Sequence, residues 1–340
     1  IMAVAAVAMA ASLFAVDVSA KIKWARNSLF DMEFKDGAKP NALQLAQPVG
    51  YYDHSAFGFK VAMSTEDVGA SFEIAPGYNP GSINFDRLTT WLKPFDMLKI
   101  TLGGNDFGYG AETIDWSKIN DISGEGFGFS ITPVAGLGID LFAFPGLSSP
   151  WWTEKAWIMA GEIKAPCGIK LGYSADFGSI NAHYRYNGND TSDIGIGYSG
   201  NFSGVGVNVN GKFDLGKDGL TGITADLFVS MGFDALGVKA YGKFGTDMKD
   251  ANDLKAKLWV TYGMDFGTIY LSVNNTSNGV GGDGSGNLLG KDFYLVAQPG
   301  VQFNIGVANC DVGLSFVMNK PENGDFGVAM HVPFAVTVGF

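Results

Sequence analysis

Hydrophobic and polar positions alternate along much of this chain, and residues 326–340, FGVAMHVPFAVTVGF, show the pattern over their whole length. Every even position there carries an apolar or aromatic side chain, whereas the odd positions are small or polar. Successive side chains of a strand point to opposite faces, so this period of two predicts a β-strand with one apolar face. About 9 to 11 tilted residues cross the hydrocarbon of a bilayer as a strand, so this segment is long enough to span a membrane.

The same alternation recurs from Phe57 onward, in runs connected in turn by tight turns and by longer loops rich in Gly, Asn and Asp. Some tight turns resemble one another, as Asp176-Phe177-Gly178 and Asp265-Phe266-Gly267 do, and each joins two alternating runs. This arrangement is typical of consecutive β-hairpins. We predict strands over residues 57–63, 68–74, 83–92, 98–102, 127–131, 137–141, 157–175, 180–186, 194–198, 205–213, 223–231, 236–244, 254–264, 269–273, 293–305, 312–318 and 326–340.

Two of these strands contain a proline, Pro166 in 157–175 and Pro299 in 293–305, but each keeps one parity throughout and is predicted to be continuous. A closed barrel with both ends on one side of a membrane needs an even number of strands. Residues 30–34 alternate as well and supply a further strand upstream. We therefore predict 18 strands, with 16 as the alternative.

Alternation alone does not separate a membrane barrel from a soluble β-sandwich, because both have one apolar face. The second face here is rich in Gly, Ser, Thr, Asn, Lys and Asp, and glycine accounts for 48 of the 340 residues. Backbone polar groups find no partners in lipid, so a sheet crosses a membrane only when it closes on itself. Long strands with alternating short and long connections match such barrels. We therefore predict an all-β, antiparallel, up-and-down transmembrane β-barrel.

Residues 1–20 look like a secretory signal peptide. The first 16 residues carry no charge, and small residues near the end of the segment suit cleavage before Lys21. The charged start of such a signal is missing, so we expect the printed sequence to be clipped there. A membrane helix is the alternative, but it needs about 20 apolar residues. We predict that residues 21–340 form a single transmembrane domain.

Composition excludes several classes of function. The net charge of −11 argues against nucleic acid as a partner. The only two cysteines, Cys167 and Cys310, provide neither a disulfide framework nor the spacing of a metal site. We predict neither a metal nor a cofactor.

With its signal, its hairpins and its final strand, the chain resembles the bacterial outer-membrane β-barrels and, more loosely, the general porins, including those of spirochaetes. The resemblance covers residues 28–340 as a pattern and contains no substrate-specific motif. It implies that the assembly machinery recognises the final strand, through Phe334, Val336, Val338 and the terminal Phe340. Pro333 departs from that pattern because it removes a donor of the strand ladder, and we expect a bulge there.

The inward parity of each strand predicts a basic inner wall between residues 160 and 260. It is predicted to carry Lys164, Lys170, His183, Arg185, Lys212, Lys239, Lys243, Lys255 and Lys257, against Glu162, Asp214 and Asp226. The loops are acidic, with Asp190, Asp218, Asp247, Asp250, Asp253, Asp283, Glu322 and Asp325. Opposed charges of this kind sort ions by sign. The alternative is that the lysines only keep a wide lumen hydrated.

With 18 strands, residues 104–123 form the third external loop, which is long enough to fold inward. General porins narrow their channel with this loop, so by resemblance its carboxylates would face Lys170, Arg185 and Lys212 across a constriction. An external cap is the alternative. The acidic residues concerned are Asp106, Glu112, Asp115 and Asp121.

An enzyme is not predicted. The chain has three histidines, His54, His183 and His331. A Ser-His pair like that of an outer-membrane phospholipase would need one of the last two beside a serine on the lipid-facing side, and both face the lumen by parity.

The sequence therefore predicts an outer-membrane porin, through which ions and small hydrophilic solutes diffuse passively. Its expected partners are outer-membrane lipids, the barrel-assembly machinery and, as an open alternative, two further copies in a homotrimer. The competing hypothesis is a structural or adhesive surface barrel with a plugged lumen. It is motivated by the inward-facing aromatic residues Phe142, Phe228, Tyr241, Trp259, Tyr270 and Tyr294.

Overall fold

The computed structural model describes residues 15–26, 30–35, 44–45, 57–76, 83–111, 118–144, 165–248, 252–275, 293–320 and 324–339. In these segments the chain forms strands joined by turns and loops, with no helix that could cross a membrane. The strands are β1 (Ala15–Arg26), β2 (Phe30–Lys35), β3 (Gln44–Leu45), β4 (Phe57–Ser64), β5 (Val68–Pro76), β6 (Ile83–Phe95), β7 (Leu98–Asp106), β8 (Ser123–Val134), β9 (Leu137–Ala143), β10 (Cys167–Ala175), β11 (Gly178–Gly188), β12 (Thr191–Phe202), β13 (Val205–Gly216), β14 (Gly219–Phe233), β15 (Leu236–Thr246), β16 (Asn252–Met264), β17 (Gly267–Asn274), β18 (Phe293–Ile305), β19 (Ala308–Gly313), β20 (Ser315–Lys320), β21 (Gly327–His331) and β22 (Phe334–Gly339).

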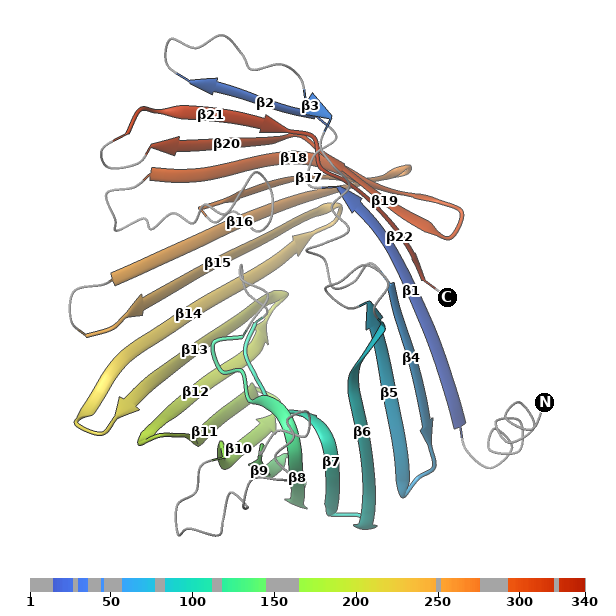
Figure 1. Cartoon of the computed structure of the whole chain (residues 1–340), viewed down its shortest axis with the longest axis vertical. Coiled ribbons are helices and arrows are strands. Elements are labelled where there is room, and N and C mark those ends of the chain that lie inside the picture. The colour runs from blue at the N-terminus through green and yellow to red at the C-terminus, as the bar shows by residue number, and fades with distance from the viewer. Residues whose placement is uncertain are drawn as a thin grey trace.

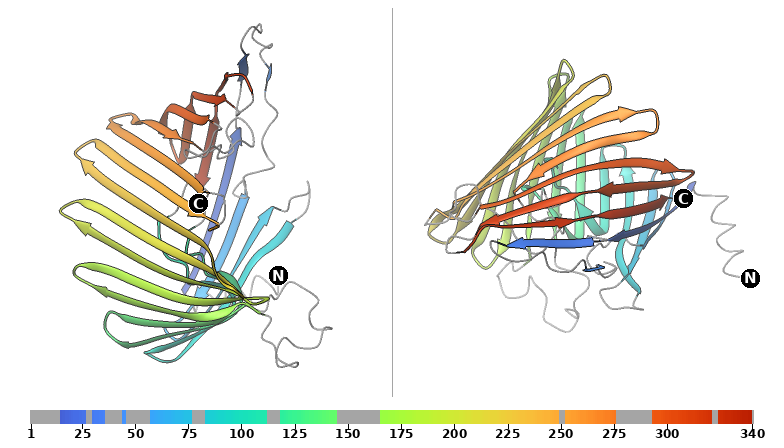
Figure 2. Two further views of the ribbon diagram at one scale, coloured as in Figure 1. Left: turned by 90° about the vertical axis from the view of Figure 1, so that its left-hand side faces the viewer. Right: turned by 90° about the horizontal axis from the view of Figure 1, so that it is seen from above.

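The strands lie side by side around a ring, and every named pairing is antiparallel (Figures 1 and 2). From β4 to β18 each strand pairs with the next in sequence, β18 pairs with β19 and β20, and β22 pairs with both β19 and β1. Because β1 also pairs with β4, the chain of pairings returns to its start.

In the described part of the chain the ring has 18 strand positions. Of the 22 strands, β1 and β2, β19 and β20, and β21 and β22 each share one position, and β3 pairs with β2 alone. The up-and-down architecture and the 18 strands are as predicted from the alternation.

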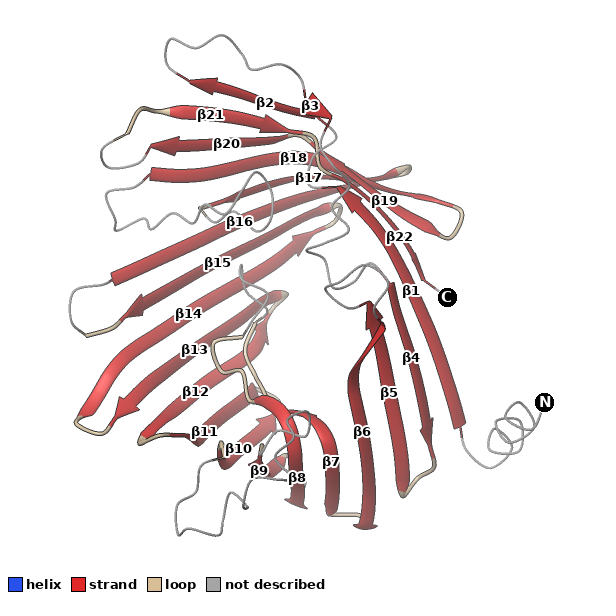
Figure 3. Ribbon diagram, viewed as in Figure 1, coloured by secondary structure: helices blue, strands red, loops and turns tan. Residues whose placement is uncertain are grey.

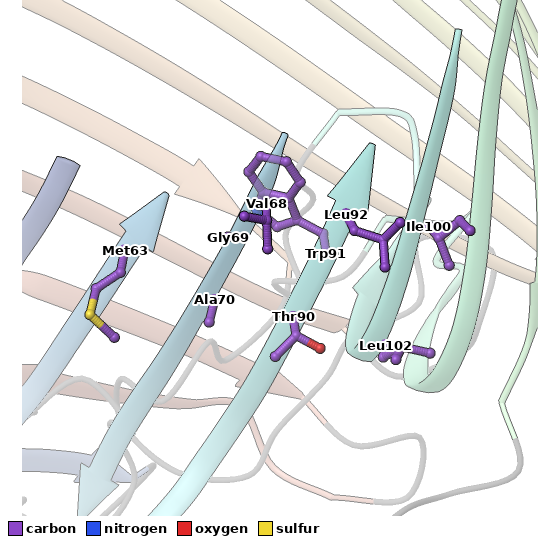
Figure 4. Close-up of a pocket in the computed structure, with 9 residues that line it drawn as sticks. All are labelled: Met63, Val68, Gly69, Ala70, Thr90, Trp91, Leu92, Ile100 and Leu102. Atoms are coloured by element: carbon purple, nitrogen blue, oxygen red, sulfur yellow. The ribbon is translucent and has the colours of Figure 1, made fainter. Parts of the chain in front are cut away.

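The faces of the sheet have the reverse polarity of a soluble protein. Large apolar side chains such as Phe127 and Ile196 are exposed on the outside, while Asp193 and Asn210 are buried within the ring. Between β4 and β7 the outer face has an apolar depression of about 370 Å³ (Figure 4). Its lining includes Met63, Val68, Ala70, Thr90, Leu92, Ile100 and Leu102.

The last strand is interrupted at residues 332–333, and this break includes Pro333, where a bulge was predicted. Its register against the preceding strand is unchanged across the break, and the Pro333 carbonyl accepts a hydrogen bond from Gly313 N at 3.0 Å. The pairing with the first strand position is different. Phe334 pairs with Arg26 of β1, and His331 pairs with Asp31 of β2, so five residue steps on the first strand lie opposite three on the last. The irregularity therefore lies between the last and first strands.

The expected strict alternation of short turns and long loops is wrong at two places. Residues 189–190 alone connect β11 to β12, and residues 217–218 alone connect β13 to β14, both at the end where longer loops were expected. Asn189 and Asp190 both have positive φ, of 51° and 59°, which is the geometry of a tight two-residue hairpin turn.

Two prolines act differently within the strands. β18 runs through Pro299 without a break, as predicted, and the Pro299 carbonyl accepts a hydrogen bond from Leu314 N at 2.8 Å. β10 begins only at Cys167, after Pro166, so the predicted strand over 157–175 is wrong at residues 165–166, and residues 157–164 lie outside the described segments.

The first strand includes part of the segment assigned to the signal peptide. Ala15–Ala20 belong to β1 and pair with β4 over Phe59–Ser64. Cleavage before Lys21 stays a prediction, and it would remove this part of β1.

Candidate functional site

The described parts of the connection between β7 and β8, residues 107–111 and 118–122, fold back against the inner face of the sheet. Figure 3 shows these two arms in tan inside the ring of strands. Phe107 N donates to the Ile122 carbonyl at 2.9 Å and Tyr109 N to the Asn120 carbonyl at 3.1 Å, so the two arms of the loop continue the ladder of β7 and β8. Tyr109 and Ile122 are buried. The described parts of residues 107–122, which we call the inner loop, therefore lie on the inner wall.

Glycines on the inner face of the neighbouring strands make room for the inner loop. A Cβ atom at Gly128 in β8 would come within 2.6 Å of Phe107 Cζ, and one at Gly197 in β12 within 2.8 Å of Tyr109 Cε2. A Cβ atom at Gly195 would come even closer to Asn120 Oδ1. Real Cβ atoms essentially never approach this closely, so larger residues at these positions would displace the loop.

A chain of hydrogen bonds fixes Tyr109 to the wall. Tyr109 Oη lies 2.8 Å from His183 Nδ1, and His183 Nε2 lies 2.6 Å from Asp193 Oδ1. Asp193 is fully buried, and its Oδ2 accepts hydrogen bonds from Arg185 Nε at 2.9 Å and Asn187 Nδ2 at 2.6 Å. Ionised Asp193 only accepts, so we assign the proton of a neutral His183 to Nε2, and Tyr109 then donates to Nδ1.

Tyr109 stays protonated in this arrangement. Burial raises the pKa of its phenol well above the ordinary value, and the negative charge of Asp193 raises it further. The phenol is therefore available as a donor at any physiological pH.

Further contacts hold the inner loop at both arms. Arg185 Nη1 donates to the Asp121 carbonyl at 2.8 Å, so Arg185 links the loop to Asp193. Phe107 stacks on Phe142 of β9 with ring centroids 5.7 Å apart, and Phe142 stacks on Phe144 at 5.2 Å. The arm before the turn thus combines the apolar packing of Phe107 with the buried hydrogen bond of Tyr109, and the returning arm is held by the hydrogen bond from Arg185 to the Asp121 carbonyl.

The predicted acidic residues of this loop make local contacts where they are described. Asp106 Oδ1 accepts a hydrogen bond from Gly108 N at 2.9 Å, and Asp121 contacts Arg185 through its backbone carbonyl. Beside Lys170 the loop places an aromatic ring, because Lys170 Nζ lies 5.9 Å from the centroid of Tyr109. Glu112 and Asp115 lie outside the described residues.

The inner wall holds more carboxylates than the sequence analysis assigned to it. Asp140 and Asp193 were not included in the inward set, and Asp253 was placed in a loop although it belongs to β16. Each lies beside a predicted basic residue. The ion pairs are Lys170–Asp140 at 3.3 Å, Arg185–Asp193 at 2.9 Å, Lys212–Asp214 at 3.2 Å and Lys255–Asp253 at 3.7 Å.

The remaining predicted basic residues differ in their surroundings. Lys243 stands in register with Asp226, and Lys257 Nζ lies 5.1 Å from the centroid of the Trp259 ring. Lys239 is exposed on the inner face. Several predicted charged residues lie outside the described segments, namely Glu162, Lys164, Asp250, Asp283 and Glu322.

Comparison with known proteins gives matches by structure. No family model and no curated protein sequence matches the chain. Among solved structures it resembles OccK2 (OpdF) of Pseudomonas aeruginosa, with a TM-score of 0.57 and 9% identity over 96% of this chain and 97% of that one. It also resembles the outer membrane protein OprD of P. aeruginosa, with a TM-score of 0.53 and 11% identity over 95% and 94% of the two chains.

This is the fold of an outer-membrane β-barrel. A third solved structure, OpdK of P. aeruginosa with vanillate, matches at a TM-score of 0.53 and 11% identity, over 96% of this chain and 98% of that one. At this level of identity the likeness concerns the fold.

The strand that pairs with the first strand of the barrel contains three of the four predicted assembly residues. Phe334, Val336 and Val338 belong to β22, between β19 and β1. Phe340 lies outside the described residues.

The described residues of the barrel hold no group of three or more His, Cys, Asp or Glu side chains suited to a metal ion. Ser315 stands in register with His331 on the neighbouring strand, but Ser315 Oγ is buried and has no hydrogen-bond partner among the described residues. The two side chains thus do not form the hydrogen-bonded pair that nucleophilic catalysis requires.

The inner loop was expected to turn inward and to face Lys170, Arg185 and Lys212 through its carboxylates. Its contacts through the Tyr109 phenol and the Asp121 carbonyl were not predicted. The inward glycines Gly195 and Gly197 were the available signal, because a strand that alternates apolar residues with glycine leaves one face free for another segment. The pairing of Tyr109 with His183 has no signal in the sequence, because 74 positions separate them.

Proposed function

We propose that the chain forms a water-filled channel in the bacterial outer membrane, through which ions and small polar solutes diffuse passively. The polarity of its two faces carries the proposal. Apolar side chains cover the outside, and the inner face carries charged and amide side chains that need water or one another as partners. Barrels of about 16 to 18 strands are wide enough for an aqueous lumen.

The solved structures support this role without specifying the solute. OprD is named as an outer membrane protein, and the structure of OpdK holds vanillate, a small organic solute. A small polar solute is proposed here on the same fold.

The inner loop is proposed to set the narrowest part of the channel. It occupies the inner face of β8–β13 and is held there by the buried hydrogen bond of Tyr109 and by the hydrogen bond from Arg185, so it reduces the width left for solutes. Asp106, Glu112, Asp115 and Asp121 belong to this connection and its flanks.

The wall is proposed to favour anions to a moderate degree. Close carboxylates compensate Lys170, Arg185 and Lys212. Their fields at the channel axis are therefore weaker than those of separate charges. Lys239, which is exposed, is proposed to contribute most to selectivity. The acidic loops are proposed to act at the channel entrance.

The proposed partners follow from the two faces and the final strand. Lipid acyl chains would cover the apolar outside, including the depression of Figure 4. The assembly machinery would recognise Phe334, Val336, Val338 and Phe340, and association of three barrels remains the expectation for the oligomer.

Conductance across a planar lipid bilayer tests the channel. Purified full-length protein is expected to produce discrete current steps in potassium chloride. Protein that inserts, as shown by protection from protease, but gives no steps would refute the proposal.

A plugged surface barrel is the second candidate, and the burial of inward aromatic rings favours it. Phe142, Tyr241, Tyr270 and Tyr294 are all buried. Tyr270 Oη, however, donates to Asp311 Oδ1 on the wall at 2.8 Å, so at least this ring is held against the sheet. Insertion without conductance would select this candidate.

A further inference from the structure

We propose that the inner wall carries a binding site for a neutral polyhydroxylated solute of monosaccharide size. The inference rests on the proposed channel and names a solute class for it. The site is a pocket of about 340 Å³ between β8 and β11, toward their tight turns. This volume is at the small end of known ligand sites. The pocket is lined by Thr132, Gly136, Leu137, Gly138, Asp140, Lys170, Gly172, Ser174 and Asn181.

The charges of the pocket compensate each other. Lys170 Nζ lies 3.3 Å from Asp140 Oδ2, and the two side chains are only 16% and 17% exposed. A solute with a net charge would be attracted by one member of the pair and repelled by the other. A neutral solute avoids this conflict.

The same pair retains hydrogen-bonding capacity. An ammonium group has three donors, and Lys170 directs one toward Asp140 while its Nζ lies beside the Tyr109 ring. Asp140 Oδ1 has no hydrogen-bond partner among the described residues. A vicinal diol could accept from Lys170 with one hydroxyl and donate to Asp140 with the other.

Neutral polar groups on the adjacent strands complete the set. Asn181 lies against the backbone of Gly172, since a Cβ there would meet its Oδ1 at 2.9 Å, and its amide offers donors and an acceptor. Ser174 lines the pocket, and its Oγ shares a hydrogen bond of 2.7 Å with Ser179 Oγ, which leaves the Ser174 hydroxyl a further lone pair as an acceptor. Alternating donors and acceptors of this kind match the hydroxyl groups of a sugar.

Glycine provides the space. A Cβ at Gly138 would meet only the Gly172 carbonyl oxygen, at 4.0 Å, so the volume above Gly138 is open. A leucine at this position would fill the pocket without colliding with the backbone. Gly245, on the inner face of β15, is similarly open and far along the sheet, which makes it a matched control.

The test compares three solutes of one scaffold: glucose, its carboxylate counterpart glucuronate and its amine counterpart glucosamine. Each is added to single channels in a planar bilayer, and the saturable reduction of current is measured. Glucose is expected to act at a concentration at least about tenfold lower than either charged solute. Gly138→Leu is expected to abolish the glucose effect, and Gly245→Leu to preserve it.

A substitution in the Lys170–Asp140 ion pair gives a second test of the site. Asp140→Asn removes the charged acceptor, and a hydrogen bond to a charged group is worth enough to weaken glucose binding by about tenfold or more. A charged solute that acts at lower concentration than glucose, or a Gly138→Leu channel with an unchanged glucose effect, would overturn the site.

Equilibrium dialysis of radiolabelled glucose against the detergent-solubilised full chain tests glucose binding independently of channel conductance. Saturable binding that Gly138→Leu abolishes supports the site even if the protein conducts no current, in which case the channel alone is wrong. Conducting channels without saturable glucose binding refute the site alone.

Discussion

Asp193 orients the side chains that hold the inner loop against the wall. Its two oxygens accept hydrogen bonds from His183, Arg185 and Asn187, and His183 and Arg185 both reach the inner loop. Parity predicted the inward orientation of His183 and Arg185. It applies equally to Asp193, three residues beyond a tight turn, but residues 187–193 were expected to form a long loop, so no parity was assigned to Asp193.

Tyr109→Phe removes the phenol that donates to His183 and leaves His183 Nδ1 buried without that donor. We expect a loss of about 1 to 3 kcal/mol in the free energy of unfolding and larger current fluctuations, since the loop is less firmly held. Denaturant titration in lipid vesicles and single-channel recording measure the two effects. Tyr173→Phe, at an exposed outer position, is the control. Equal effects of the two substitutions would contradict this role of Tyr109.

Charge reversal separates exposed from paired lysines. Lys239→Glu is expected to move the reversal potential in a salt gradient toward cation selectivity more than Lys212→Glu does. The reason is that Asp214 lies 3.2 Å from Lys212 and already offsets its charge. If neither substitution changes selectivity, the basic wall plays no part in it.

Among the elements, strands were predicted well and their connections were not. Alternation is a local consequence of two unlike faces, so the 17 strand positions from Phe57 onward were visible in the sequence, together with β2. The strand β1 was not predicted, because its residues were assigned to the signal peptide or left unassigned. The two-residue turns at 189–190 and 217–218 and the position of the inner loop depend on contacts between distant segments. Such contacts leave little trace in one sequence.

Gly197→Leu tests the fit between the inner loop and β12. The new side chain would occupy the place of the Tyr109 ring, so the loop should leave its seat. We expect a larger and noisier conductance with the same barrel fold. The control is Gly245→Leu, because a Cβ there meets no atom within 4 Å. Unchanged conductance in Gly197→Leu would show that the loop does not narrow the channel.

The N-terminal strand gives a prediction of its own. If residues 1–20 are a signal peptide, the mature protein begins at Lys21 and pairs with β4 only at Lys21 and Ile22 of β1. Intact-mass measurement of the protein isolated from outer membranes should show Lys21 as the first residue. A mass that includes Ala15–Ala20 would instead place this part of β1 in the mature barrel.

For the whole molecule, the unbroken sequence of strand pairings and the reversed polarity of the faces account for the fold together. A sheet whose edges pair with each other has no unpaired edge in the membrane, and β22 provides this closure between β19 and β1. The inner loop then determines how much of the enclosed space remains for solutes.

Single-channel conductance, measured for the full chain and for a variant with a shortened inner loop, tests most directly whether the barrel is a channel narrowed by this loop. In the variant a two-residue Asn-Gly turn replaces residues 107–122, because Asp106 and Ser123 are already in register. We predict discrete current steps for both proteins and clearly larger steps for the variant. Inserted protein of either kind without current steps, or equal steps from both, would contradict this proposal.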